Sequence, residues 1–153
     1  SRIGHGINLL WDEDTLLRMR DSRFLVEINL ISNELLGYVP NIDLHPFPIY
    51  LRQGIPCCLN TDDRGMWDSN FTDEVFVAVK RFNLSWDELQ ATARASYEHC
   101  FALEPTKSEL KLAFEADLAE FESKFTAANW KQLAAKVPAV THGYGHRTLG
   151  LSL

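Results

Sequence analysis

Phe24-Leu25-Val26-Glu27-Ile28-Asn29-Leu30-Ile31 carries the strongest strand signal in this sequence, because it is nearly all apolar. Such a run is typical of a strand that is covered on both faces. We expect Ser32 and Asn33 to end it. A second apolar stretch is Ile55-Pro56-Cys57-Cys58-Leu59-Asn60-Thr61, and a shorter one, Arg2-Ile3-Gly4, resembles the tip of a third strand.

Helical patterns separate and follow these strands. The sequence predicts helices over 12–21, within 43–54, over 71–82 with Thr72 as its cap, over 85–103 with Ser85 and Glu88 as a capping box, and from Pro105 onward. Strands that alternate with helices predict an α/β fold built from parallel β/α units. We expect one unit over 1–135 and a loose tail over 136–153.

Composition narrows the classes of partner. The net charge is −6 with acids and bases interspersed, so we expect no nucleic-acid binding. No apolar run approaches the ~20 residues that span a bilayer, so we expect no membrane insertion. The three cysteines form no C-x-x-C pair, which argues against a zinc site of the cytidine deaminase type and favours reduced thiols. The compartment stays open: cytoplasmic is favoured, with periplasmic or secreted as alternatives.

Polar side chains follow each predicted strand. His5 follows the first, Ser32 and Asn33 the second, and Asp62 and Asp63 the third. The carboxyl ends of parallel strands form one edge or rim, so these groups should converge there. A divalent cation would relieve the repulsion between the two aspartates, although Asp-Asp-Arg-Gly is equally good turn chemistry. His5 could orient a metal-bound water, or simply cap its strand end.

The other histidines are not expected to act in chemistry. His45 should belong to the start of a helix, and His99 should be a half-buried packing residue. His142 and His146 lie in a glycine-rich tail, where the glycines argue against a helix that could pair them on a metal.

These segments resemble the adenosine deaminase family. Arg2-Ile3-Gly4-His5-Gly6, Glu27-Ile28-Asn29-Leu30-Ile31-Ser32-Asn33 and Asn60-Thr61-Asp62-Asp63 occur in the order and spacing of that family. The segment over 71–102 also resembles the helical stretch that comes after the paired aspartates in that family, so the resemblance covers about residues 1–125. Three separate motifs in register make it specific.

The resemblance implies the C-terminal part of a TIM (β/α)8 barrel with one catalytic zinc. It implies hydrolytic deamination of adenosine or a related 6-aminopurine nucleoside or nucleotide, in which a zinc-activated water attacks C6 and ammonia leaves. Asp62 would then be a zinc ligand, and Asp63 would hydrogen-bond the purine. His5 would hold the attacking water and help to deprotonate it. Ser32 and Asn33 would shape the strand end.

The sequence departs from the family pattern in two places. Asn29 and Leu30 replace a Cys-Pro pair, and Arg64-Gly65 stands where a proline is common. The second variant is similar to the N6-modified AMP deaminase branch, while residues 44–54 are similar to the secreted growth-factor-like adenosine deaminases. The exact purine therefore stays open.

The family's His-x-His pair, its third metal-binding histidine and its catalytic glutamate are not found in these 153 residues. Catalytic zinc takes three or more protein ligands, and a full barrel takes about 250 residues. We therefore expect the chain to be a fragment, inactive alone, that meets the missing part of its barrel or another copy of itself. Two alternatives remain: a non-catalytic deaminase-like protein used for binding or assembly, and another metallohydrolase on the same barrel.

Overall fold

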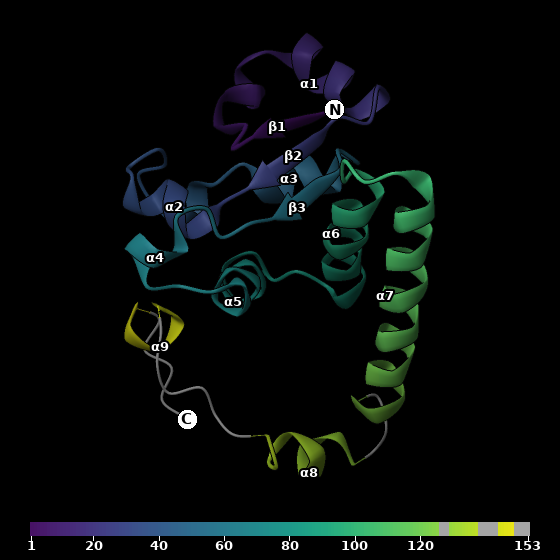
Figure 1. The fold of residues 1–153 in the computed structure, drawn as a ribbon. Coiled ribbons are helices and arrows are strands. Elements are labelled where there is room, and N and C mark those ends of the chain that lie inside the picture. Colours follow the sequence, from purple (N-terminus) through teal and green to yellow (C-terminus); the bar gives the residue numbers. More distant parts are fainter. Residues whose placement is uncertain (126–128, 138–143, 149–153) are drawn as a thin grey trace.

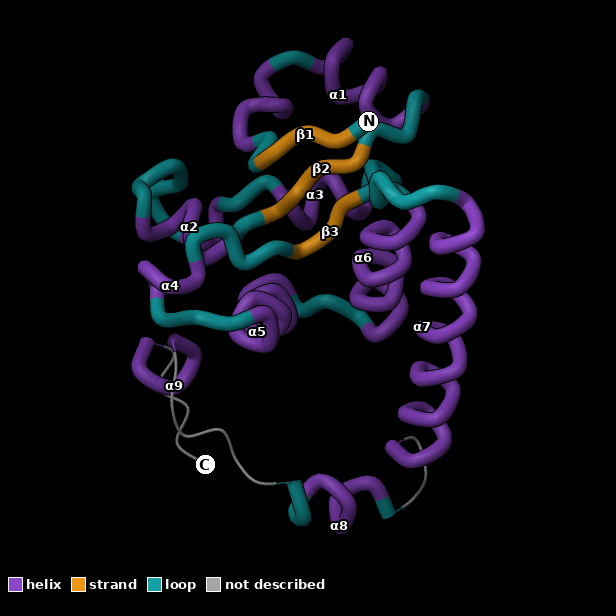
Figure 2. Tube along the Cα trace, viewed as in Figure 1, coloured by secondary structure: helices purple, strands orange, loops and turns teal. Residues whose placement is uncertain are grey.

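Three short parallel strands form the centre of the fold (Figure 1). The structure, a computed structural model, describes residues 1–125, 129–137 and 144–148. The strands β1 (Arg2–Gly4), β2 (Leu25–Ile28) and β3 (Cys57–Leu59) lie side by side in chain order. Ile3 pairs with Val26, and Val26 pairs with Cys57. Helices connect successive strands, so the predicted parallel α/β units are present (Figure 2).

The other elements of the described residues are helices, several of them short. They are η1 (Ile7–Trp11), α1 (Glu13–Asp21), α2 (Leu30–Leu35), η2 (Ile42–Leu44), α3 (Phe47–Arg52), α4 (Arg64–Trp67), α5 (Phe71–Phe82), α6 (Trp86–Glu98), α7 (Glu104–Phe125), α8 (Trp130–Ala134) and α9 (Tyr144–Thr148). No helix among the described residues is both long and apolar enough to cross a membrane.

The second strand ends earlier than its sequence predicts. β2 stops at Ile28, and Leu30 begins helix α2, so Ser32 and Asn33 lie inside a short helix and do not end a strand. Two backbone N–H groups at the start of α2 find their acceptors on one carboxylate: Leu30 N and Ile31 N donate to Glu74, at 3.0 and 3.2 Å. An apolar run alone does not distinguish a buried strand from a buried helix, and here a distant glutamate stabilises the change.

The start of helix α6 agrees with the sequence prediction, whereas the end of α6 and the cap of α5 differ from it. Helix α6 begins with the predicted capping box of Ser85 and Glu88, but it ends at Glu98, five residues early. The cap of α5 is Asn70, in a capping box with Asp73, so the expectation for Thr72 was wrong. The tail prediction falls mostly outside the described residues; within them, residues 144–148 are helical, contrary to the expectation for the segment around His146.

One face of the sheet packs on the main hydrophobic core, to which α2, α3 and α5 contribute. Its members with almost no exposed surface are Val26, Ile28, Leu30, Ile31, Phe47, Tyr50, Ile55, Cys57 and Ala78. On the other face, Leu25 and Cys58 pack against Ala95 of α6. Helix α7 runs beside α6, with Phe121 stacked on Trp86 and Arg94 paired to Glu115. The chain thus buries one apolar cluster on each face of the sheet, against strands β2 and β3.

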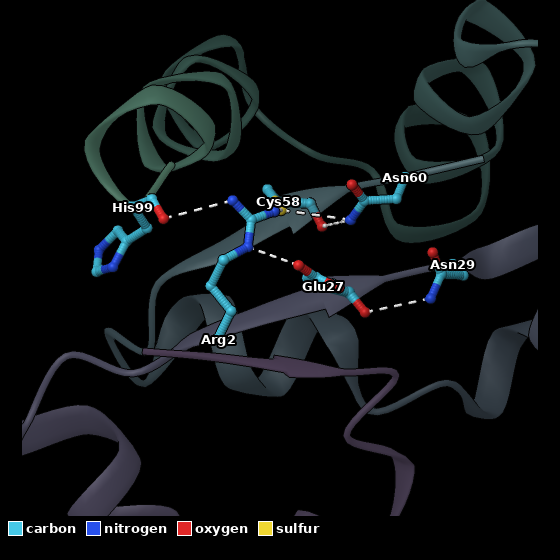
Figure 3. A network of polar contacts seen from close by, with 6 residues as sticks. All are labelled: Arg2, Glu27, Asn29, Cys58, Asn60 and His99. Atoms are coloured by element: carbon cyan, nitrogen blue, oxygen red, sulfur yellow. Dashed lines mark hydrogen bonds and ion pairs between the residues drawn. The ribbon is translucent and has the colours of Figure 1, made fainter. Parts of the chain in front are cut away.

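Polar groups extend along the same face as Leu25 and Cys58 (Figure 3). Arg2 Nε donates to Glu27 Oε1 at 2.5 Å, and Arg2 Nη1 donates to the carbonyl of His99 at 3.4 Å. Asn60 Nδ2 donates to the Cys58 carbonyl at 3.3 Å. His99 lies at the end of α6 and is half-buried, as predicted. The thiols are free, and those of the two adjacent cysteines are buried.

Candidate active site at the strand ends

Helix α2 joins the ends of the first and third strands. Its Asn33 carboxamide lies 2.8 Å from Nδ1 of His5, the residue that follows β1. Its Ser32 hydroxyl donates to Oδ2 of Asp62, which lies beyond β3, at 2.6 Å. Because Ser32 and Asn33 are adjacent, the histidine and the aspartate are held at one rim of the sheet. The predicted convergence of these residues is therefore observed.

The backbone is left-handed at both strand ends. His5 has φ 60° and Asp62 has φ 51°, a region that non-glycine residues rarely occupy. Strained positions of this kind cluster at functional sites, where the surrounding structure holds them. Gly6, with φ 61°, follows His5, and a Cβ there would come within 2.7 Å of Val26 Cγ1. The turn that presents His5 thus requires glycine at its next position.

Asp63 lies beside Asp62 at the start of α4, exposed to solvent. Its side chain does not cap that helix, and no hydrogen bond of its carboxylate is found among the described residues. Ser32 engages one oxygen of Asp62, and no hydrogen bond to the second oxygen is found among the described residues. The pair therefore offers carboxylate oxygens to a cation or to a hydrogen-bond donor.

A buried histidine extends the site inward. His45 is 2 % exposed, and its Nε2 lies 2.8 Å from the Asn33 carboxamide. Its Nδ1 accepts from Phe47 N at 3.1 Å, which satisfies the first turn of α3 as the sequence predicts for a residue at a helix start. Burial, helped by the nearby charge of His5, lowers the pKa of His45 to about 4. His45 is therefore neutral near pH 7, and its contact with Asn33 had no signal in the sequence.

Two more side chains complete the surroundings of His5. Asn29 Nδ2 lies 3.0 Å from His5 Nδ1 and 3.4 Å from the carbonyl of Glu27. The Tyr38 ring meets the His5 ring edge-on, with centroids 5.9 Å apart. In the sequence Asn29 stands out only as a departure from a family pattern, yet its amide contacts the candidate catalytic ring.

Glu74 holds the start of helix α2 by accepting hydrogen bonds from its backbone. It is fully buried, and burial raises its pKa to about 8, outweighing the two N–H groups that donate to it; the charges of Asp73 and Asp62 add to the rise. This carboxyl belongs to α5 but fixes the start of α2. It had no signal in the sequence, where it is one acid among many on a helical pattern.

The donor set for a metal ion is partial. Among the described residues, no three histidine, cysteine, aspartate or glutamate side chains gather in a group that could hold a metal. Asp62, oriented by Ser32 and with one oxygen unengaged, fits a single carboxylate ligand of zinc. The described part of the chain therefore offers one carboxylate that fits a zinc ligand, and not a complete metal site.

The sequence model described as adenosine deaminase matches residues 1–120. This chain belongs to the adenosine deaminase family. It is 34% identical over 109 residues to an adenosine deaminase of Shewanella halifaxensis, covering 71% of this chain and 33% of that protein. It is 34% identical over 115 residues to the N6-mAMP deaminase of Arabidopsis thaliana, covering 75% and 32%. The chain thus spans about a third of the length of these relatives.

Solved structures agree with the family assignment. The adenine deaminase of Arthrobacter aurescens superposes with a TM-score of 0.68 at 29% identity, over 71% of this chain and 33% of that one. The apo N6-methyl-AMP deaminase of Arabidopsis thaliana gives a TM-score of 0.70 at 31% identity, over 78% and 35%. The three parallel strands are accordingly part of the family's TIM barrel, and the predicted fold is confirmed.

Proposed function

We propose that this chain forms the C-terminal part of the active site of a zinc-dependent enzyme that hydrolytically deaminates a 6-aminopurine nucleoside or nucleotide. The observation that carries the proposal is the delivery of His5 and Asp62 to one rim through neighbouring residues of α2, at 2.8 and 2.6 Å. Both residues also have left-handed backbone, as expected where geometry serves chemistry.

Each site residue has a distinct part. Asp62 would bind the zinc ion through its unengaged oxygen, with the Ser32 hydroxyl fixing the carboxylate. When bound, zinc supplies Lewis acidity that makes a water molecule nucleophilic near neutral pH. His5 would hold that water at the rim, and the exposed carboxylate of Asp63 would accept a hydrogen bond from the purine. The nitrogen that leaves C6 departs as ammonia.

We propose that the remaining groups come from outside the described part of this chain. One carboxylate ligand is too few for catalytic zinc, which takes at least three protein ligands. We propose that another part of the same protein, or a second copy of the chain, completes both the zinc site and the barrel. Sedimentation of the protein as isolated tests the second route: a dimer supports self-association, and a monomer with a complete zinc site supports the first.

Names of the relatives favour two kinds of substrate. The first is adenosine or adenine, after the deaminases of Shewanella halifaxensis and Chelativorans. The second is N6-methyl-AMP, after the relatives in Arabidopsis thaliana and Danio rerio. An Arabidopsis relative has been solved in complex with IMP, a deaminated nucleotide. Because Arg64-Gly65 follows the paired aspartates, a variant similar to the N6-modified AMP deaminase branch, we propose N6-methyl-AMP as the second candidate substrate.

The test is turnover by the intact protein supplied with zinc. Ammonia release and the ultraviolet change of the purine are followed with adenosine, adenine, AMP and N6-methyl-AMP. Asp62→Asn should lower kcat/KM by more than about 100-fold, because even partners that only orient a ligand account for about 10–100-fold. Asp117→Asn, an exposed aspartate of α7, should leave kcat/KM unchanged.

Two results would contradict the proposal. Full activity of Asp62→Asn would remove the metal-ligand role. Absence of turnover on all four purines by zinc-loaded protein would favour a non-catalytic binding protein, or a metallohydrolase for another ring amine or amide.

A further inference from the structure

The hydrogen bonds around His45 determine which of its nitrogens carries a proton. Phe47 N–H is a backbone donor and points at Nδ1 of His45 at 3.1 Å, so Nδ1 must present its lone pair. A neutral imidazole then carries its proton on Nε2. The ring is 2 % exposed and its pKa is lowered to about 4, in agreement with a neutral state. His45 Nε2 is therefore a donor.

The Asn33 carboxamide must match this donor. It lies 2.8 Å from His45 Nε2 on one side and 2.8 Å from His5 Nδ1 on the other. The oxygen and nitrogen of an amide have nearly the same shape, so the hydrogen-bond network decides which one faces which ring. The structure places Asn33 Oδ1 on the His5 side and Nδ2 on the His45 side. Because His45 donates, we infer the opposite orientation of this amide, with its oxygen toward His45 and its NH2 group toward His5. In that orientation Asn33 donates to Nδ1 of His5.

Asn29 gives the same result independently. Its Nδ2 lies 3.4 Å from the carbonyl of Glu27, an acceptor, so the NH2 group belongs on that side. The same Nδ2 lies 3.0 Å from His5 Nδ1. If His5 carried its proton on Nδ1, two donors would face each other there. Both amides thus require a lone pair on Nδ1 of His5.

We propose that buried His45, acting through Asn33 and assisted by Asn29, fixes the neutral tautomer of His5 so that its proton sits on Nε2. Among the described residues, no hydrogen bond engages that nitrogen, which leaves its N–H for a group at the rim. The part this gives His5 in catalysis rests on the proposed function. There it is a donor that holds an oxygen nucleophile, and in this tautomer it is not the base that deprotonates it. His45 and Asn33 are positioning residues.

Nitrogen chemical shifts of His5 measure the tautomer directly and need no substrate, zinc or turnover. The spectra are recorded on the labelled protein at a pH where both imidazoles are neutral, and His5→Gln assigns the signals. We expect a pyridine-like Nδ1 and a pyrrole-like Nε2. A pyrrole-like Nδ1 in the unmodified protein overturns the proposal. Because activity is not involved, the tautomer can fail while the proposed function survives, and the reverse.

Asn33→Asp provides the sharpest variant, since it keeps the shape and offers only acceptors. The carboxylate should draw a proton onto Nδ1 of His5, so the Nδ1 signal should move from pyridine-like to pyrrole-like. If His5 already donated from Nδ1, the variant would leave this signal in place and contradict the assignment. Thermal unfolding checks that the variant folds.

Two variants of His45 form a matched pair. They distinguish the effect of its hydrogen bond to Asn33 from the effect of its packing. In His45→Gln the longer amide can reach Asn33, whereas in His45→Asn the shorter one caps Phe47 N but does not reach Asn33. We expect His45→Gln to keep the Nε2–H tautomer of His5. His45→Asn should raise the population of the Nδ1–H form. Identical His5 shifts in the two variants would overturn the role of His45.

Discussion

Replacing Glu74 with glutamine should change how the stability of this protein depends on pH. The Glu74 carboxyl is fully buried and accepts hydrogen bonds from Leu30 N at 3.0 Å and Ile31 N at 3.2 Å. Burial raises its pKa from 4.5 to about 8. The folded protein therefore holds a proton that the unfolded chain releases above about pH 4.5.

The sign and size of the effect follow from this difference. A pKa that is higher in the folded state stabilises the protein fully below pH 4.5, and this contribution disappears as the pH rises through about 8. Each pH unit between the two values lowers the free energy of unfolding by about 1.4 kcal/mol. From about pH 5 to about pH 8 the loss is about 3–4 kcal/mol. Glutamine does not titrate, so the variant should lack this slope.

Glutamine has its own cost at low pH. Its NH2 group faces one of the two backbone donors, and a buried N–H left without an acceptor costs about 1–3 kcal/mol. The variant should be less stable than the unmodified protein at pH 5, and the difference in their free energies of unfolding should shrink steadily toward pH 8.

Urea unfolding at several pH values between 5 and 8 measures this difference. Glu109→Gln, an exposed glutamate on α7, is the control and should follow the unmodified protein at every pH. Stability curves for Glu74→Gln that run parallel to those of the unmodified protein would refute a raised pKa at Glu74.

Two further predictions concern packing and capping. Asn70→Ala should lower the free energy of unfolding by about 1 kcal/mol, because it removes the capping box of α5. The control is Asn129→Ala, at a helix start without a side-chain cap bond, which should change the free energy of unfolding by less than about 0.5 kcal/mol. Urea unfolding midpoints compare the two variants. Phe47→Ala should cost about 3–5 kcal/mol because this ring has no exposed surface, and Ile49→Ala, 45% exposed on the same helix, should cost much less in thermal unfolding; equal losses would contradict the described core.

Local chemistry made much of this fold predictable. The boundaries of α5 follow from its apolar spacing, and the start of α6 follows from the Ser85 and Glu88 capping box, which depends on residues three positions apart. The convergence of His5 and Asp62 was predictable because parallel strands deliver their carboxyl ends to one rim. Roles at that rim came from family resemblance and not from spacing.

Features that depend on distant partners were not predictable. The change from β2 to α2 is stabilised by Glu74, which lies 44 residues beyond Leu30 in the chain. His45 has an ordinary place at the start of α3, and only the folded chain brings it to Asn33. The sequence pattern does not single out Asn70 as the cap of α5, because Thr72 is an equally suitable residue type nearby, and only the hydrogen-bond geometry distinguishes the two.

Ser32 and Asn33 form a common mount for two groups that are far apart along the chain. A small translation or tilt of α2 moves the His5 imidazole and the Asp62 carboxylate in the same direction. The distance between these two groups therefore changes little when the flanking loops move. Conversely, inserting or deleting one residue in α2 would rotate these two side chains by about 100° around the helix axis and release both partners at once. Tolerance to such insertions should consequently be far lower in this short helix than in the exposed connections on either side of it.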